Sequence, residues 1–425
     1  MMSRTLRIGV AGLGRGFTLM LPTFVADPRV ALVAAADPRL EARQQFGQDF
    51  GAPAYASVAE LCADPGVEVV HVATPHHLHA AHVAAAAAAG KHVLVEKPMA
   101  IRLDECQAMI AATRQAGVQL VVGHSHSFDR PIARARDLIA GGDVGPLRMI
   151  TALNFTDFLY RPRRPEELAT DQGGGVIFSQ GAHQIDIVRL LGGGRVRSVR
   201  ALTGAWDDTR PTEGAYAALL TFADGAFASV IYSGYGHFDS DEFCGQIDEL
   251  GQPKDANHYG AARRALRALD PVARVEPSRS PGSESPDETQ PRLSQGLQPG
   301  YDEAEAALKN ARAYGGPSYR ASSSAEPPRH QHFGFIIASC ERADLRPLPN
   351  GVMVYGDGEA KLDPLPAPAI PRVEVIDELY GAVVNARPPL HGGEWSLATL
   401  EVCLAILQSA RQGREIEVSH QVAVP

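Results

Sequence analysis

Glu96 and Lys97 form a charged pair directly after a short apolar run at 92–95, and Pro98 follows them. The run has the composition of a buried strand, which offers charged groups no solvation, so the pair should face a crevice where the strand ends. A lysine ammonium there can hold a substrate oxygen and exchange its proton, and burial lowers its proton affinity. A surface ion pair is the alternative interpretation.

His183 is the second residue with a clear chemical use. It lies on a predicted helix over 180–191, after the glycines at 173–175, and Asp186 follows about one helical turn later. The carboxylate of Asp186 can accept one imidazole N–H and leave the other nitrogen of His183 facing a substrate. A helix histidine that bonds a backbone carbonyl is the alternative interpretation.

A glycine-rich loop follows the first predicted strand, 6–10. Its glycines let the backbone turn sharply and approach a pyrophosphate, whose oxygens bind N–H groups at a helix N-terminus. The strict dinucleotide pattern has its third glycine where this chain has Phe17, so a tight turn without a ligand is the alternative. The loop residues expected at the cofactor are Gly12, Leu13, Gly14, Arg15, Gly16 and Phe17.

Asp37 ends the second predicted strand and can accept hydrogen bonds from the adenosine ribose, which favours NAD over NADP. Arg39 can instead receive the 2′-phosphate of NADP, so both cofactors stay open. The third and fourth strands end beside the same crevice, where His79 has the alternative role of capping carbonyl groups. The other residues expected at the cofactor are Ala73, Thr74, Pro75, His76, His79, Glu96 and Lys97.

A run of arginines and prolines, 161–165, precedes the glycine loop of the second half. Guanidinium groups bind carboxylates through two parallel hydrogen bonds, so the run suits an anionic substrate, and a solvated basic loop is the alternative. His124 and His126 have the spacing of metal ligands, but we see no matching carboxylate or cysteine set and expect no metal. The residues expected at the substrate are His124, His126, Arg161, Arg163, Arg164, Ser179, Gln180 and His183.

The elements that must position these groups follow two patterns. Through residue 123, short runs that are apolar at every position alternate with helical stretches, which is typical of a doubly wound α/β domain with a parallel sheet. We expect strands at 6–10, 30–36, 67–73, 92–95 and 118–122, and helices at 57–64, 79–89 and 103–116. Later strands are joined by turns, as in an open, mainly antiparallel sheet with helices on one face. They are expected at 148–154, 196–203, 215–222, 226–233, 333–339 and 352–355, with helices at 180–191 and 396–412.

Residues 248–330 carry no strand signal. The segment 276–300 has a linker-like composition, while its flanks at 256–269 and 302–313 favour helices. We therefore predict three parts. They are a dinucleotide-binding domain, 1–123; an α+β substrate-binding domain, 124–247 and 331–425; and an insertion, 248–330, part helical and part disordered.

Composition limits the classes of partner. The chain has 425 residues, 45% of them apolar, and its 40 basic and 49 acidic residues give a net charge of −9. That balance argues against a nucleic-acid or membrane partner, because both need clustered basic residues. The five cysteines are scattered, which fits free thiols in a reducing compartment. With no signal-peptide pattern, we expect a cytoplasmic enzyme with a small-molecule substrate.

Together, these motifs resemble the glucose–fructose oxidoreductase/inositol dehydrogenase/MocA (Gfo/Idh/MocA) family. The resemblance rests on the glycine loop, Ala73-Thr74-Pro75, Glu96-Lys97-Pro98 and the later glycines with His183, in the family's order. It implies a Rossmann domain followed by an open sheet for substrate binding and self-association. It also implies a bound nicotinamide dinucleotide, with Lys97 and His183 at the reacting carbon.

Two departures from the pattern of the family narrow the range of candidate substrates. Ser179 stands where members that oxidise sugars have aspartate, and His124 lies where many have arginine. The missing carboxylate removes a partner for sugar hydroxyls. The segments 154–158, 161–165 and 340–347 look like the branch of phthalate 4,5-cis-dihydrodiol dehydrogenase, whose substrate is an anionic cyclic diol that becomes a catechol on oxidation.

The resulting hypothesis is a nicotinamide-dependent dehydrogenase that oxidises a carbinol of a small cyclic substrate. Lys97 would deprotonate the hydroxyl while His183 supports the oxygen or relays the proton. A sugar or inositol dehydrogenase is one alternative, and a lyase or glycosidase with no net redox change is another. A dinucleotide sensor is the last, and the proton-transfer pair argues against it. A homo-oligomer formed through the open sheet is expected.

Overall fold

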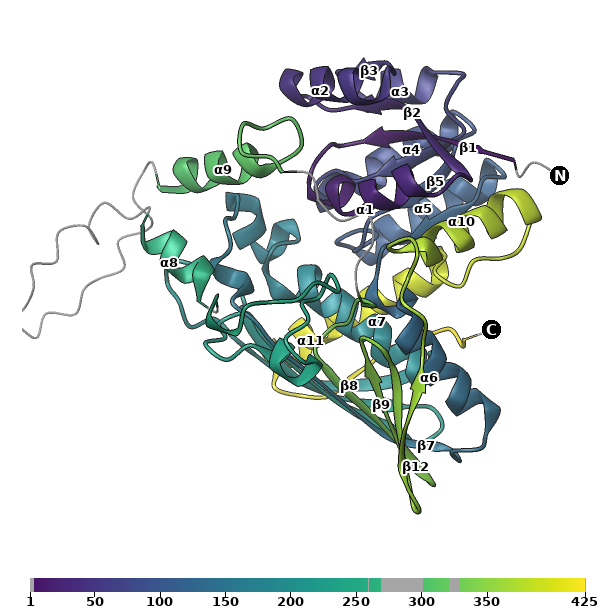
Figure 1. The fold of residues 1–425 in the computed structure, drawn as a ribbon, viewed down its shortest axis with the longest axis vertical. Helices are drawn as coiled ribbons and strands as arrows, with labels where there is room; N and C mark the ends of the chain where they lie inside the picture. Colours follow the sequence, from purple (N-terminus) through teal and green to yellow (C-terminus); the bar gives the residue numbers. More distant parts are fainter. Residues whose placement is uncertain (1–3, 259, 269–300, 321–328, 425) are drawn as a thin grey trace, which may run out of the picture.

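Two sheets and the helices around them make up the part of the chain that the computed structural model describes, residues 4–258, 260–268, 301–320 and 329–424 (Figure 1). The N-terminal sheet has six parallel strands in the order β3-β2-β1-β4-β5-β6. This is the Rossmann order, with a crevice where the order reverses between β1 and β4. Its strands are β1 Leu6–Ala11, β2 Val30–Ala36, β3 Ala54–Tyr55, β4 Val69–Val72, β5 His92–Val95 and β6 Leu120–Val122.

Helices on both faces explain why the strands are apolar at every position: β4 and β6 are buried throughout. The predicted α/β class is confirmed. The strand β3 was not predicted, because its two residues are too few to show any periodicity. The helices of this part are α1 Arg15–Ala26, α2 Leu40–Phe50, α3 Val58–Ala63, α4 His79–Ala88 and α5 Leu103–Gln115.

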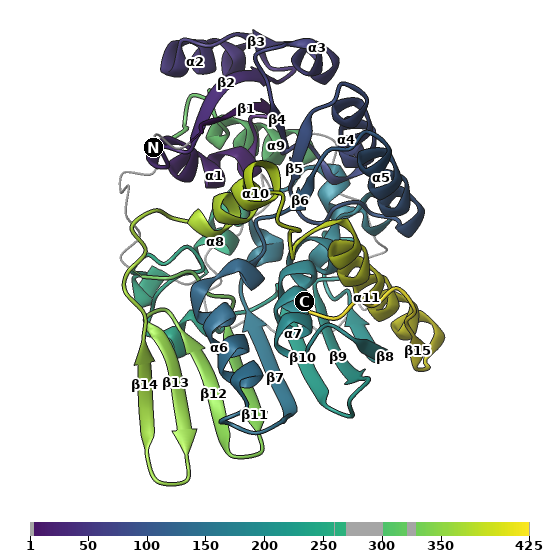
Figure 2. The same ribbon diagram turned by 90° about the vertical axis from the view of Figure 1, so that its right-hand side faces the viewer.

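The second sheet has nine strands in the order β14-β13-β12-β11-β7-β10-β9-β8-β15, all antiparallel except the parallel pair β7 and β10. Figure 2 shows α6, α7 and α11 on one face of this sheet. The strands are β7 Leu147–Phe155, β8 Val196–Gly204, β9 Ala215–Phe222, β10 Phe227–Ser233, β11 Phe335–Cys340, β12 Ala343–Leu348, β13 Gly351–Gly356, β14 Ala360–Pro364 and β15 Ile416–Glu417. The helices are α6 Arg130–Gly141, α7 Ala182–Leu191 and α11 Gly393–Gln412.

The predicted insertion supplies two helices, α8 Ala261–Arg267 and α9 Tyr301–Arg312. The low-complexity segment 276–300 lies outside the described residues. Tyr314, just after α9, is fully buried and packs edge-on against Phe17 at 5.1 Å between ring centroids. This part of the insertion therefore rests on the dinucleotide-binding domain.

Helix α10, Val373–Asn385, was not predicted, and it returns the chain to the first domain. Val375, Ile376 and Leu379 join the apolar core that contains Leu6 and Ile8 of β1. Assigning the whole of 331–425 to the second domain is therefore wrong for this helix. An apolar stripe shows that a helix must be covered, but not which sheet covers it.

Among the helices of the described ranges, none combines the length and the hydropathy that a membrane span requires.

Candidate active site

The glycine loop forms a close-fitting cradle at the N-terminus of α1. Gly12 has a φ of 92°, and a Cβ there would lie 2.8 Å from the carbonyl oxygen of Ala73. A Cβ on Gly16 would lie 2.9 Å from Cγ of Glu96, so Gly16 allows α1 to approach the end of β5. The first N–H groups of α1 have no intrahelical acceptor and are available to a pyrophosphate. The loop therefore fits a dinucleotide, although Phe17 is buried in the core.

The predicted ribose acceptor, Asp37, is tied to the two residues beside it. Its carboxylate accepts hydrogen bonds from Leu13 N at 2.8 Å and from Arg39 N and Nε at 2.9 and 3.0 Å. Arg39 also donates to the carbonyl oxygens of Tyr314 and Leu13, at 3.2 and 2.9 Å. A 2′-phosphate would meet the Asp37 carboxylate and an arginine already engaged, so the arrangement favours NAD.

Two of the predicted histidines brace the loops beside this crevice. The ring nitrogens of His79 face the carbonyl oxygens of Pro98 and Thr74, at 3.0 and 2.9 Å. His76 Nδ1 lies 3.1 Å from the carbonyl oxygen of Gly173, at the edge of the second domain. His79 therefore matches the alternative interpretation, in which it holds the end of β4 against the Glu96-Lys97-Pro98 segment.

Lys97 lies at the end of β5, where its Nζ donates to the carbonyl oxygen of Ser179 at 2.5 Å. This bond joins the Rossmann sheet to the loop that leads into α7. Burial lowers the pKa of Lys97 to about 8, although the charges of Glu96 and Glu249 oppose the shift. A minority of this amine, larger than for an ordinary lysine, is therefore neutral and able to act as a base near physiological pH. Ser179 contributes its backbone, not its hydroxyl, to this contact.

His183, on α7, reaches the same place from the second domain. Burial and the charge of Lys97 hold its pKa well below the usual range, so the imidazole is neutral. Its Nδ1 has no hydrogen-bond partner among the described residues. Lys97 and His183 are thus within electrostatic reach of each other, and one buried nitrogen of His183 has no hydrogen-bond partner among the described residues.

The expected partner of His183 is wrong. The carboxylate of Asp186 accepts from Trp395 Nε1 at 2.6 Å, from the Thr399 hydroxyl at 2.7 Å and from the Ser127 hydroxyl. Asp186 therefore anchors α7 to α11 and to the 124–128 segment, and it holds the helix that carries His183 rather than its imidazole.

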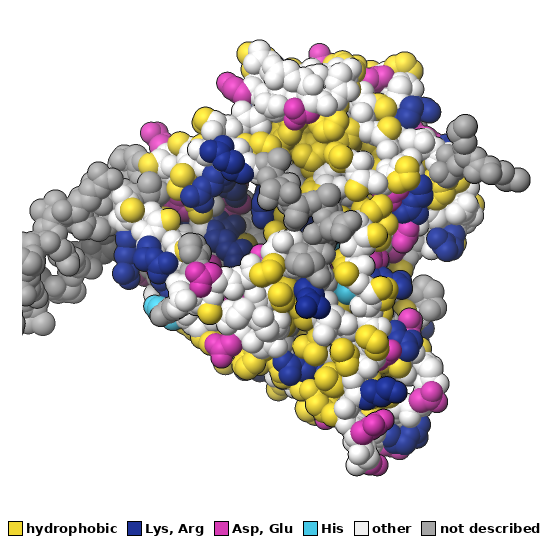
Figure 3. Space-filling view, in the orientation of Figure 1, with side chains coloured by type: hydrophobic (Ala, Val, Ile, Leu, Met, Phe, Trp, Pro, Cys, Tyr) yellow, Lys and Arg dark blue, Asp and Glu magenta, His cyan; other side chains and the backbone are white. Residues whose placement is uncertain are grey.

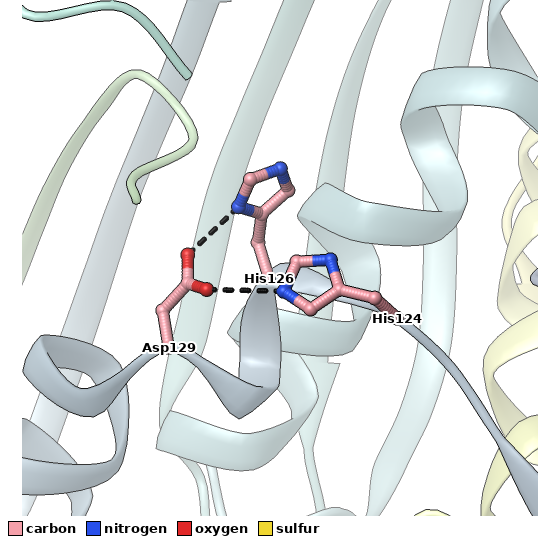
Figure 4. A group of neighbouring side chains, drawn as sticks. All are labelled: His124, His126 and Asp129. Carbon is pink, nitrogen blue, oxygen red and sulfur yellow. Dashed lines mark hydrogen bonds and ion pairs between the residues drawn. The ribbon is translucent and has the colours of Figure 1, made fainter. Parts of the chain in front are cut away.

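His124 and His126 lie beside His183, with ring centroids 6.4 and 4.8 Å from it. Figure 4 shows one oxygen of Asp129 facing each ring: Oδ1 is 3.2 Å from His124 Nε2, and Oδ2 is 2.7 Å from His126 Nδ1. The other nitrogen of each ring points away from Asp129 (Figure 4). Asp129 thus fixes which nitrogen of each histidine is offered to the pocket.

These three side chains are also the one group within the described ranges whose nitrogen and oxygen atoms are close enough together to hold a metal ion. We expected no carboxylate to accompany the histidines, and Asp129 overturns that expectation. Its oxygens already accept from both rings, and the cationic side chains of Lys97 and Arg372 interact with the neighbouring histidines. Both features favour a hydrogen-bonded network over a cation at this place.

The arginines of the predicted run 161–165 have different surroundings. Arg163 donates to the Phe158 carbonyl oxygen at 2.6 Å with its guanidinium over the Phe158 ring, and Arg164 donates to Asn310 of α9 at 2.8 Å. Both fix the loop to its surroundings. Arg161 is the member whose charge interacts with Glu249 and Arg15 at the pocket. Figure 3 shows Lys and Arg side chains gathered around a hollow between the two domains.

Sequence reasoning missed three charged residues at the site. Asp129 could have been found from the sequence, because Asp129 follows His126 by one helical turn. Glu249 comes from the insertion and interacts electrostatically with Lys97. Arg372 precedes α10 and interacts electrostatically with Lys97, His124 and His183. No local sequence motif identifies Glu249 or Arg372 as site residues, because only the tertiary fold brings their segments close to Lys97.

Comparison with known proteins identifies the family of the chain. Residues 6–124 match an oxidoreductase family with an NAD-binding Rossmann fold, and residues 132–244 match the Gfo/Idh/MocA C-terminal domain. The chain belongs to the Gfo/Idh/MocA family. As a Gfo/Idh/MocA protein it is an oxidoreductase with an NAD-binding domain, which confirms the resemblance seen in the sequence.

Several Gfo/Idh/MocA relatives are informative. The 1-carboxy-3-chloro-3,4-dihydroxycyclohexa-1,5-diene dehydrogenase of Comamonas testosteroni is 46% identical over 96% of this chain and 95% of its own length. The trans-1,2-dihydrobenzene-1,2-diol dehydrogenase of Mus musculus is 34% identical over 44% of this chain and 56% of its own length. A solved dehydrogenase structure from Bordetella bronchiseptica RB50 has a TM-score of 0.84 at 40% identity, covering 97% of this chain and 100% of its own.

The shifted pKa of Lys97 predicts unusual amine reactivity. Competitive acetylation across pH 6–11, read by peptide mass spectrometry, should show Lys97 half-deprotonated near about pH 8 because burial disfavours its charge. Lys254 is the internal control, since hydrogen bonds to Asp239 and Asp241 raise its pKa. Acetylation of Lys97 over the same pH range as Lys254 would contradict the assignment.

The bonds of Asp37 predict how cofactor choice can be changed. The wild-type protein should bind NADH at least about tenfold more tightly than NADPH, and Asp37→Ser should narrow or reverse that ratio, because it removes the carboxylate and releases Arg39. Fluorescence titration with both dinucleotides measures the ratio. Adding Arg39→Gln should abolish the gain for NADPH; an equal gain without Arg39 would refute this role.

Proposed function

We propose that this protein is an NAD-dependent dehydrogenase of a carboxylated cyclic cis-dihydrodiol, which it oxidises to the corresponding catechol. The observation that carries the proposal is the convergence of Lys97 and His183, from two different domains, within electrostatic reach of Arg372. The finer candidate is the phthalate compound 4,5-dihydro-4,5-dihydroxyphthalate. The printed names of the Comamonas and mouse relatives, both dehydrogenases of cyclic diols, support the substrate class.

The residues of the chain divide the chemistry as follows. NAD, when bound, supplies the hydride acceptor. Lys97, as the neutral amine, takes the hydroxyl proton while the carbinol carbon loses its hydride, so a C–H and an O–H bond break and a C=O bond forms. The imidazole of His183, which burial and the charge of Lys97 keep neutral by lowering its pKa, holds the same oxygen. The resulting ketone tautomerises to a catechol, and the aromaticity gained favours oxidation.

The loop before α7 explains why a simple sugar is a poorer candidate. Position 179 is serine, and its carbonyl oxygen is occupied by Lys97. No carboxylate is therefore present at this position to accept hydrogen bonds from two neighbouring sugar hydroxyls.

Turnover gives the direct test. Purified protein with NAD should form NADH with the cis-dihydrodiols of phthalate or benzoate, and Lys97→Met should lower kcat by about 10²–10⁴-fold because it removes the general base. Arg148→Met, which alters an exposed ion pair with Glu341, is the matched control and should keep full activity. NADH formation only with inositol or hexoses would refute the proposal, as would product formation with no net change in NADH.

We also propose that the protein self-associates through the open face of the second sheet. Leu202, Leu219 and Phe227, on the adjacent strands β8, β9 and β10, are exposed by 64%, 55% and 46%. Exposed apolar side chains on neighbouring strands form the kind of patch that interfaces cover. Sedimentation at micromolar concentration should show an oligomer that Leu202→Asp/Leu219→Lys converts to monomers. A monomeric wild-type protein would disprove this.

A further inference from the structure

Arg372 stands out among the buried arginines of the described ranges because it has neither an ionic partner nor a set of several hydrogen bonds. It is 8% exposed, and its one hydrogen bond within the described ranges runs from Nε to the neutral amide oxygen of Gln331, at 3.2 Å. A buried cation is costly unless it is paired. The side chain therefore lacks an anion that would offset its desolvation.

Other buried arginines of this chain have partners that offset the free energy of desolvating a guanidinium. Arg210 pairs with the buried Glu305 at 2.9 Å. Arg189 donates to oxygens of Trp395, Thr399 and Gln421 at 2.7 to 3.0 Å. Arg372 has neither an ion pair nor several hydrogen bonds, so its contacts differ from those of arginines that stabilise the fold.

The position of Arg372 is set by its backbone. The Thr23 hydroxyl of α1 donates to the carbonyl oxygen of Pro371, and Val375 N donates to the carbonyl oxygen of Arg372 at 3.1 Å. Arg372 itself has a φ of 52°, a left-handed conformation that an L-residue keeps only where its surroundings impose it. The backbone of Arg372 is thus fixed at the N-terminal end of α10, and the hydrogen bond from Nε to Gln331 orients the guanidinium.

From that place Arg372 interacts electrostatically with the candidate catalytic groups. The charge of Arg372 acts on Lys97, His124 and His183, the groups that surround the reacting carbon in the proposed function. Glu96 and Asp129 are the carboxylates whose charges reach Arg372, but neither forms an ion pair with it, and Asp129 is engaged by two histidines. The terminal nitrogens of Arg372 are also absent from the buried polar atoms that lack a partner, so solvent reaches them.

We propose that Arg372 binds the carboxylate of the substrate through two parallel hydrogen bonds, and so makes a carboxylated ring the preferred substrate class. The planar guanidinium fork matches a carboxylate, which would provide the counter-ion that the protein lacks. The carboxylate would lie on Arg372 while a carbinol of the same ring lies at Lys97 and His183. This inference rests on the proposed function, because it specifies the substrate of that same site.

The competing role is a contact with a cofactor phosphate, since Arg15 of the glycine loop also interacts electrostatically with Arg372. The N–H groups at the start of α1 already provide for the pyrophosphate. The structure instead associates Arg372 with the proton-transfer residues, which favours the substrate. The test below separates the two roles.

Substrates with and without a carboxylate provide the test. Wild-type protein should oxidise the cis-dihydrodiol of benzoate with a KM about 100-fold below that for the uncharged cis-dihydrodiol of benzene, the range expected for a buried charged pair. Arg372→Met should raise the KM for the benzoate compound to nearly that for the benzene compound, so that the ratio of the two KM values approaches one. The Kd for NAD should stay unchanged.

Calorimetry gives a readout independent of turnover. With NADH present, wild-type protein should bind 3,4-dihydroxybenzoate about 100-fold more tightly than catechol, and Arg372→Met should lose the difference. Arg372→Gly is a second variant that suits the left-handed backbone, so its thermal midpoint should not fall. Arg148→Met is the matched control and should keep the preference for the carboxylate.

The outcomes separate the two proposals. If wild-type protein oxidises no dihydrodiol, the proposed function fails. If it oxidises both dihydrodiols, and Arg372→Met and Arg372→Gly keep the preference for the carboxylate, the role of Arg372 fails while the function stands. A rise in the Kd for NAD with unchanged carboxylate preference would assign Arg372 to the cofactor and overturn the inference.

Discussion

The hydrogen bond from Lys97 to the carbonyl oxygen of Ser179 is the contact on which the site depends, because it joins the end of β5 to the loop before α7. It also keeps the amine in a desolvated place, where the pKa of Lys97 falls to about 8. A lysine on the surface would remain charged and be a poor base. The meeting of the two domains thus both positions this side chain and sets its chemistry.

Two carboxylates hold the histidines near Lys97 in place, either by bonding their rings or by fixing the helix that carries them. Asp129 holds His124 and His126 by one nitrogen each, while Asp186 holds α7 through Trp395 and Thr399. His183, in contrast, keeps an unpartnered Nδ1. Rigid neighbours around a free nitrogen are what a site needs if it is to hold a ligand without rearranging first.

The positive groups of the pocket have different roles. Arg163 and Arg164 fasten their loop to Phe158 and to α9, whereas Arg372 has no ionic partner. Arg161 interacts electrostatically with Glu249, which comes from the insertion. The insertion therefore contributes charge to the site, and through Tyr314 it also contacts Arg39 and Phe17 of the dinucleotide-binding domain.

The sequence by itself determined the alternating α/β class of the first domain, and it singled out the glycine loop and the pair Lys97 and His183 as candidates. Those features depend on periodicity and on spacing within short segments, which neighbouring residues alone encode. Only the tertiary structure decided that Asp186 braces a helix instead of an imidazole, that α10 returns to the first sheet and that Arg372 enters the pocket. These outcomes depend on which distant surfaces pack together, and an apolar stripe or a lone arginine carries no information about its partner.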